Sequence, residues 1–79
     1  MQNKNYNYAF LDPKGLYGPQ SGQFVQPRLE VSTDKWGTTT TNAKWIDPMS
    51  GQIFRHGIIS VKEKDGTVYD INNPQGKRQ

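Results

Sequence analysis

Cationic and aromatic side chains adjoin one another along this chain, a combination that can bind single-stranded nucleic acid. Lysine and arginine pair with phosphates, while bases stack on aromatic rings. Each of three aromatic residues, Trp36, Trp45 and Phe54, has a lysine or arginine as its immediate neighbour. The residues that we expect to contact nucleic acid are Trp36, Lys35, Lys44, Arg55, Lys62 and Lys64.

An alternative interpretation of the same residues is purely structural. Neighbours on a β-strand point to opposite faces, so a lysine beside a tryptophan does not by itself make a shared surface. The rings can instead form the core while the lysines cover the outer face. The nucleic-acid interpretation requires Trp36, which lies in a predicted loop, to be exposed. We expect Trp45, in a predicted strand, to be buried.

Acid–base or nucleophilic catalysis has few candidate residues in this sequence. His56 is the single histidine, and a Ser–His–acid triad would need it beside Ser50 or Ser60 and a carboxylate. The aspartates that precede or occupy predicted turns have a structural role there. These are Asp12, Asp34, Asp47 and Asp65. We therefore predict no catalytic residue and no enzymatic activity.

Metal and cofactor sites lack their usual sequence patterns. The chain has no cysteine, which excludes disulfides, Cys-ligated zinc and thiol chemistry. Histidine and acidic residues do not cluster at metal-ligand spacing. Neither a phosphate-binding glycine loop followed by lysine nor a dinucleotide fingerprint is present. We accordingly predict no metal and no cofactor.

Length and composition indicate one small domain over residues 1–79. Only 32% of the residues are hydrophobic, so the core must be thin and must rely on aromatic rings. The formal net charge of +3 permits a polyanionic partner without requiring one. The absence of cysteine, of a signal-peptide-like N-terminus and of a long apolar run predicts a cytoplasmic protein with no membrane partner.

Two β-hairpins are the clearest local predictions. Residues 43–55 place two apolar-aromatic runs around Asp47-Pro48-Met49-Ser50-Gly51, a strong turn sequence. Residues 57–72 place two alternating segments around Asp65-Gly66, a common hairpin tip. In the first arm of this second hairpin, Ile59 and Val61 are expected to point the same way. Gly57, between the hairpins, is expected to mark a bend or bulge.

The remaining segments give weaker predictions. Alternating aromatics predict a short strand over residues 6–10, and residues 11–22 are dense in turn formers. Residues 23–32 predict a strand that Pro27 confines to a sheet edge or a bulge. Residues 33–42 predict a loop whose threonines can extend into the next strand. Residues 1–7 are expected to form a flexible arm and residues 73–79 a frayed tail.

Together these segments predict an all-β fold of four to five antiparallel strands. A small curled sheet and an SH3-like or OB-like barrel are both compatible with them. For function we predict a non-enzymatic binding module for single-stranded nucleic acid. The alternative is a small protein-interaction or inhibitor protein that binds another protein through its β surface, or that forms a homodimer.

Overall fold

The computed structural model describes residues 9–78, which form seven β-strands and no helix. Five strands make one antiparallel meander in the order β3-β4-β5-β6-β7, and β1 and β2 form a separate two-stranded ribbon. The strands are β1 Leu16–Tyr17, β2 Phe24–Val25, β3 Arg28–Thr33, β4 Thr39–Ile46, β5 Ile53–Lys62, β6 Thr67–Asp70 and β7 Asn73–Arg78. The prediction of an all-β fold is confirmed. The sheet stays open, with β3 and β7 as its edges, so it is a curled sheet and not a barrel.

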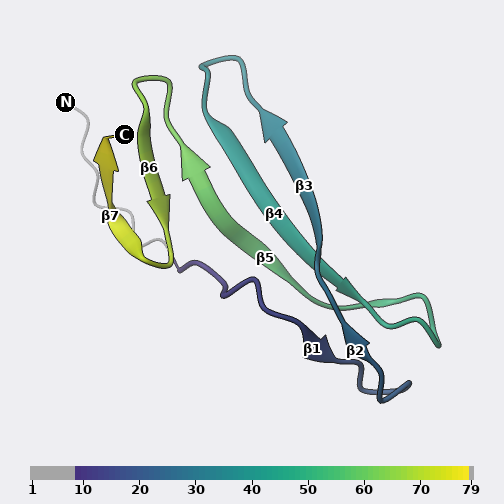
Figure 1. Cartoon of the computed structure of the whole chain (residues 1–79). Coiled ribbons are helices and arrows are strands. Elements are labelled where there is room, and N and C mark those ends of the chain that lie inside the picture. The colour runs from purple at the N-terminus through teal and green to yellow at the C-terminus, as the bar shows by residue number, and fades with distance from the viewer. Residues whose placement is uncertain (1–8, 79) are drawn as a thin grey trace.

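The sheet is long and thin, and the chain measures 47 × 24 × 20 Å along its principal axes. In Figure 1 the β3–β4 and β5–β6 connections lie at one end of the sheet. The β4–β5 connection and the β1–β2 ribbon lie at the other end (Figure 1). The molecule therefore has two distinct ends, each built from turns of different parts of the sequence.

Both predicted hairpins are present, because their turn residues make the local hydrogen bonds that reverse the chain. In the β4–β5 turn, the amide of Gly51 donates to the carbonyl of Asp47 at 2.7 Å. In the β5–β6 turn, the amide of Gly66 donates to the carbonyl of Glu63 at 3.0 Å, with Gly66 at φ 94°. A positive φ of this size suits glycine, which has no Cβ to clash.

Three segments differ from their sequence predictions. Residues 73–78 form strand β7 on β6 instead of a frayed tail, and Gly76 adopts φ 90° at the irregularity in the β6–β7 register. Residues 23–32 divide into β2 and β3, because Pro27 interrupts the pairing, although the prediction of an edge strand is correct for β3. Phe10 is not in a strand, and the rest of the predicted strand over 6–10, like the predicted arm over 1–7, lies outside the described residues or at their border.

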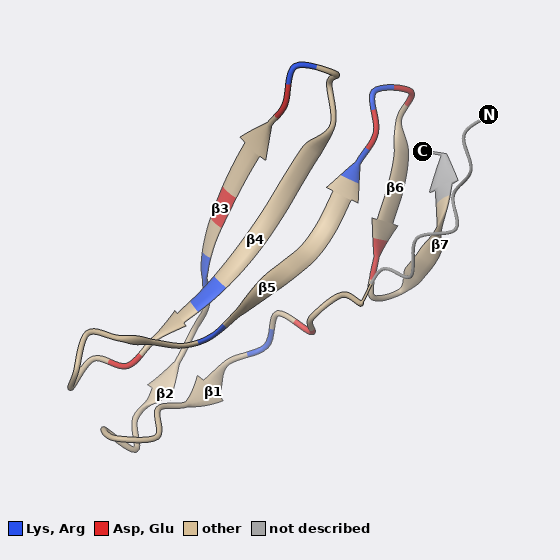
Figure 2. Cartoon of the chain, turned by 180° about the vertical axis from the view of Figure 1, so that it is seen from behind, with Lys and Arg blue, Asp and Glu red and all other residues tan. Residues whose placement is uncertain are grey.

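One small core lies at the β4–β5 turn end of the sheet. Trp45 and Ala43, both fully buried, share a sheet face with Gly57, the cross-strand partner of Ala43. The segment before β1 runs alongside β5 (Figure 2), and the amide of Leu11 donates to the carbonyl of Ile58. The indole N–H of Trp45 donates to the carbonyl of Lys14 at 3.0 Å. The Leu11 side chain occupies the space over Gly57, since a Cβ there would lie 2.6 Å from Leu11 Cδ1.

A second small core lies nearer the other end and on the opposite face. Val61 and Tyr69 are register partners, and each is only 6% exposed. The Tyr69 ring packs against Gly76, where an added Cβ would be 2.4 Å from Cε2. The change of face follows from a bulge in β5: Ser60 pairs with Thr41 and Ile58 with Asn42, which leaves Ile59 as the extra residue. Ile59 has no register partner on β4, whereas Val61 pairs with Thr40, so the pairing leaves the predicted shared face of these two residues untested.

A buried carboxylate joins the β1–β2 ribbon to the β4–β5 turn. Asp47, 1% exposed, accepts hydrogen bonds at Oδ2 from the amides of Gln20 and Ser21 and at Oδ1 from the amide of Met49. Burial raises the pKa of the Asp47 carboxyl, but these amide donors and the Ser21 hydroxyl outweigh burial and hold the pKa below its ordinary value. The hydrogen bonds of the folded chain therefore favour the ionised form of the Asp47 carboxyl group.

Candidate nucleic-acid interface

The β3–β4 and β5–β6 turns lie side by side and contact each other. A Cβ at Gly37 would lie 3.1 Å from Lys64 Cβ, so the Lys64 stem passes over the Gly37 backbone. The Thr38 hydroxyl donates to the Glu63 carboxylate at 3.2 Å. Residues separated by about a third of the chain are therefore held together at one end of the sheet.

The two turns have the same backbone design. The amide of Asp34 donates to the carbonyl of Thr38, and the amide of Glu63 donates to that of Thr67. Each turn closes through a glycine of positive φ, 85° at Gly37 in the first turn. An aspartate carboxylate supports each: Asp34 Oδ1 accepts from the amides of Trp36 and Thr38, and Asp65 Oδ1 from the amide of Thr67. Such turns hold the side chains at their tips in defined directions.

Trp36 projects from the first turn into solvent, with 69% of its surface exposed. The Lys35 Nζ lies 4.7 Å from the centroid of the indole ring, within cation–π range. Trp36 is therefore exposed, as the nucleic-acid interpretation requires.

Four of the six predicted contact residues gather at this end. The contact with Gly37 places Lys64 at this end of the sheet. Lys62 lies there as well, because it pairs with Thr39, the first residue of β4. We call Lys35, Trp36, Lys62 and Lys64 the hairpin-tip cluster. Sequence reasoning named these residues, but it did not foresee that Gly37 and Thr38 bring the two turns together.

The other two predicted contact residues lie elsewhere and have other partners. Lys44 Nζ forms an ion pair with the Glu30 carboxylate at 2.8 Å. The Arg55 guanidinium carbon lies 6.0 Å from the centroid of the Trp45 ring on the face that holds the first core. Lys44 and Arg55 are thus separated from the hairpin-tip cluster by most of the length of β4 and β5.

Acidic side chains balance the charge of the cluster. The two turns and their flanks carry three lysines and three carboxylates, and Figure 2 shows both signs at this end. The carboxylates are those of Asp34, Glu63 and Asp65. All three accept hydrogen bonds from the turns or have other partners in the structure, so they keep the turns in shape while lowering the local potential. The exposed ring, more than net charge, distinguishes this surface.

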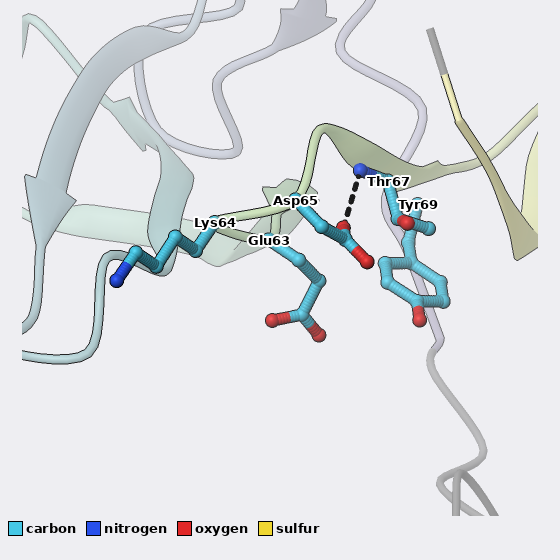
Figure 3. A pocket seen from close by; sticks show the side chains of 5 residues that line it. All are labelled: Glu63, Lys64, Asp65, Thr67 and Tyr69. Atoms are coloured by element: carbon cyan, nitrogen blue, oxygen red, sulfur yellow. Dashed lines mark hydrogen bonds between the residues drawn. The ribbon is translucent and has the colours of Figure 1, made fainter.

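A pocket of about 240 Å³ opens beside the β5–β6 turn (Figure 3). Its lining residues are Glu63, Lys64, Asp65, Thr67 and Tyr69. Carboxylate oxygens accept hydrogen bonds from the exocyclic amino groups of bases, and a lysine ammonium donates to phosphate. Lys64 belongs both to this pocket and to the contact with Gly37, so the pocket is continuous with the hairpin-tip cluster.

A larger pocket of about 460 Å³ lies between the segment before β1 and the end of β6. Asp12 and Asp70 line it together with Ser60, Ile59 and neighbouring residues, and Asp70 Oδ1 accepts a hydrogen bond from the Asn72 amide. The smaller pocket also has two carboxylates, but Lys64 offsets them, whereas the lining of the larger pocket has no lysine or arginine and is therefore unsuited to phosphate. Sequence reasoning missed it, because Asp12 and Asp70 meet only through the fold.

The residues considered for catalysis do not assemble. His56 pairs with Lys44 and Ser60 with Thr41, which puts His56 and Ser60 on opposite faces of the sheet. Ser50 lies in the β4–β5 turn, where its hydroxyl accepts from the Gln52 amide. Within residues 9–78, no three histidines, cysteines or acidic residues are grouped as a metal ion would need.

Comparisons with protein-family models, with curated proteins and with solved structures found no match for this chain. The described part of the chain also contains no helix with the length and apolar character needed to cross a membrane.

Proposed function

We propose that this chain is a non-enzymatic binding protein that takes single-stranded nucleic acid at the hairpin-tip cluster. The observation that carries the proposal is the exposure of Trp36 on a turn that also contacts Lys64. A base can stack on the free indole surface, a contact worth roughly 1–3 kcal/mol. We expect Lys35, whose Nζ lies 4.7 Å from the indole centroid, and Lys62 and Lys64, at the adjoining end of β5 and its turn, to meet the phosphates on either side of that base.

Single strands fit this surface better than duplexes. A base in a duplex is already stacked on its neighbours, and reaching it requires a flipped or unpaired nucleotide. The turns also offer no helix or ribbon of basic residues that would follow a groove. The cluster is therefore suited to unpaired bases, with sequence preference arising mainly from stacking.

The charge balance of the cluster leads to a modest dependence on salt. For single strands the slope of log K against log salt is about −0.7 for each phosphate contact. Three lysines give a slope of roughly −2. A much steeper slope would indicate that other cations contribute to the binding.

Fluorescence can test the proposal directly. A short oligothymidylate or oligouridylate is titrated at low salt, and tryptophan quenching and the anisotropy of a labelled oligonucleotide are recorded. We expect quenching from Trp36, because Trp45 is buried. Trp36→Ala should weaken binding by roughly tenfold or more while leaving the fold intact. Absence of binding at low salt by the intact chain would refute the proposal.

A matched control is available at the other end of the sheet. Met49 is as exposed as Trp36, each at 69%, and it lies in the β4–β5 turn. Met49→Ala should leave oligonucleotide affinity unchanged. An equal loss of affinity in both variants would mean that binding does not depend on the hairpin tips.

A second function, protein binding, is favoured by a different observation. Large apolar side chains are exposed along the sheet and ribbon, whereas the buried hydrophobic residues identified are Ala43, Trp45, Val61 and Tyr69. The exposed ones include Tyr17, Phe24, Leu29, Val31, Ile53 and Ile71. Exposed apolar groups on this scale mark interaction surfaces when they are contiguous. Leu29 and Val31 satisfy that condition, since both lie on β3 and point to one face.

A further inference from the structure

Strand β3 presents an edge that is ready to pair with another strand. Its only strand partner among the described residues is β4, and all six of its residues are exposed. Native proteins usually protect such an edge with proline, a bulge or an inward charge. The register of β3 with β4 is continuous and β3 contains no proline, since Pro27 lies just before it.

The direction of the free backbone groups follows from the turn that ends the strand. The amide of Asp34 donates toward β4, to the carbonyl of Thr38. Because inward and outward groups alternate along an antiparallel strand, the amides and carbonyls of Leu29, Val31 and Thr33 point away from β4. These same residues place their side chains on one face, where Leu29 is 53% and Val31 65% exposed.

We infer that a second copy of this chain pairs with β3, antiparallel and centred on Val31, to make one continuous ten-stranded sheet from the two five-stranded ones. In this register Val31 faces Val31 of the second copy, and Leu29 faces Thr33. Three residues of each copy then donate one hydrogen bond apiece, six in all. The inference deepens the second function named above and is independent of nucleic-acid binding.

Charge complementarity selects the occupant and the register. Centred on Val31, the pairing places Arg28 of each copy opposite Asp34 of the other, and Glu30 opposite Ser32. Opposite charges across a strand pair stabilise it, whereas like charges destabilise it. A two-fold axis thus pairs the β3 edge of one copy with the same edge of the other copy, as a symmetric dimer requires.

Neighbouring registers are less favourable. Centring on Glu30 places the two Glu30 side chains opposite each other at the closest cross-strand distance. Centring on Leu29 opposes Val31 to Pro27, which has no amide to donate. Centring on Ser32 opposes Glu30 to Asp34. The register centred on Val31 alone among these uses every outward amide of the strand without a like-charge pair.

The absence of cysteine from the chain makes the test direct. In the proposed register the Val31 Cα atoms lie about 5.5 Å apart, which a disulfide can span. Val31→Cys should therefore give a covalent dimer on mild oxidation. Leu29→Cys should not, because the two Leu29 positions are offset by four residues along the strands. Met49→Cys, at an exposed site in the β4–β5 turn, controls for random oxidation.

Sedimentation equilibrium of the unmodified chain supplies the second measurement. We expect a reversible dimer, with Val31→Pro raising its dissociation constant by about tenfold or more because two hydrogen bonds are lost across the axis. Val31→Lys, which keeps the backbone amide, covers the case in which the proline variant does not fold. A chain that remains monomeric at every concentration would overturn the inference, as would a dimer that neither Val31→Pro nor Val31→Lys weakens. Crosslinking of Leu29→Cys with no crosslinking of Val31→Cys would overturn the register.

Discussion

Asp47 Oδ2 accepts a hydrogen bond from the backbone amide of Gln20 at 2.8 Å, across 27 residues of sequence. This contact holds the β1–β2 ribbon against the β4–β5 turn. Gly18 makes room for it, since a Cβ at Gly18 would lie 3.0 Å from the Asp47 carboxylate. The amide of Ser21 donates to the same carboxylate oxygen, so we expect the position of the ribbon to depend on the charge of Asp47.

Acid should destabilise the fold through this carboxylate. The pKa of Asp47 is lower in the folded chain than in the unfolded chain, so its stabilising contribution is complete above the ordinary aspartate pKa of about 4. The contribution is lost as the pH falls through the folded-state value. Urea unfolding between pH 7 and pH 2 should therefore show stability declining from about pH 5 downward.

The variant Asp47→Asn isolates the role of this charge. It should lower the melting temperature at pH 7 by roughly 5–10 °C and flatten the acid dependence. Glu30 is the control: its pKa is lowered by a hydrogen bond and charge attraction from Lys44, but it is half exposed and screened by solvent. Glu30→Gln should change stability much less. Equal effects of the two variants would contradict the special role of Asp47.

Trp45 is the side chain whose removal should cost the most. It is fully buried, and its indole N–H donates to the Lys14 carbonyl. Trp45→Ala should lower the free energy of unfolding by roughly 3–5 kcal/mol, enough to unfold much of a domain of this size. Trp45→Phe, which loses the hydrogen bond but keeps much of the ring, should cost less. Unchanged thermal stability of Trp45→Ala would refute its role in the core.

Gly57 should resist substitution because of its neighbour across the sheet face. A Cβ would lie 2.6 Å from Leu11 Cδ1, closer than real Cβ contacts allow. Gly57→Ala should destabilise the fold by roughly 1–3 kcal/mol through overpacking. In the Leu11→Ala background the same change should be nearly neutral, because the obstructing side chain is gone. A double-mutant cycle by urea unfolding measures this coupling, and simple additivity would argue against the contact.

The predicted cations should separate into two groups in oligonucleotide binding. Lys35→Gln and Lys64→Gln remove charges of the hairpin-tip cluster and should each weaken binding about two- to fivefold at low salt, with a shallower salt slope. Lys44→Gln and Arg55→Gln should leave the affinity nearly unchanged, because these residues lie away from the cluster. Anisotropy titrations at several salt concentrations measure both quantities. Equal losses at all four positions would favour diffuse electrostatic attraction over a defined site.

The turns are the part of this fold that the sequence predicts best. Asp47-Pro48 with Gly51, and Asp65-Gly66, define hairpins because proline, aspartate and glycine act on the backbone within a few residues. The edge position of β3 follows similarly, since Pro27 cannot donate a ladder hydrogen bond. Gly76 shows the limit of such local rules: with Pro74 it predicted a frayed tail, but residues 73–78 form β7, and the missing Cβ of Gly76 leaves room for the Tyr69 ring.

The sequence by itself determined an all-β chain, its strongest hairpins and the identity of its cationic and aromatic residues. Only the tertiary structure decided which of those residues meet. The bulge at Ile59 sends Val61 to the face opposite Trp45, and the contact between Gly37 and Lys64 brings two turns together. The physical reason is that a turn depends on neighbouring residues, whereas register, bulges and the meeting of turns depend on long-range packing, which no single segment of the sequence specifies.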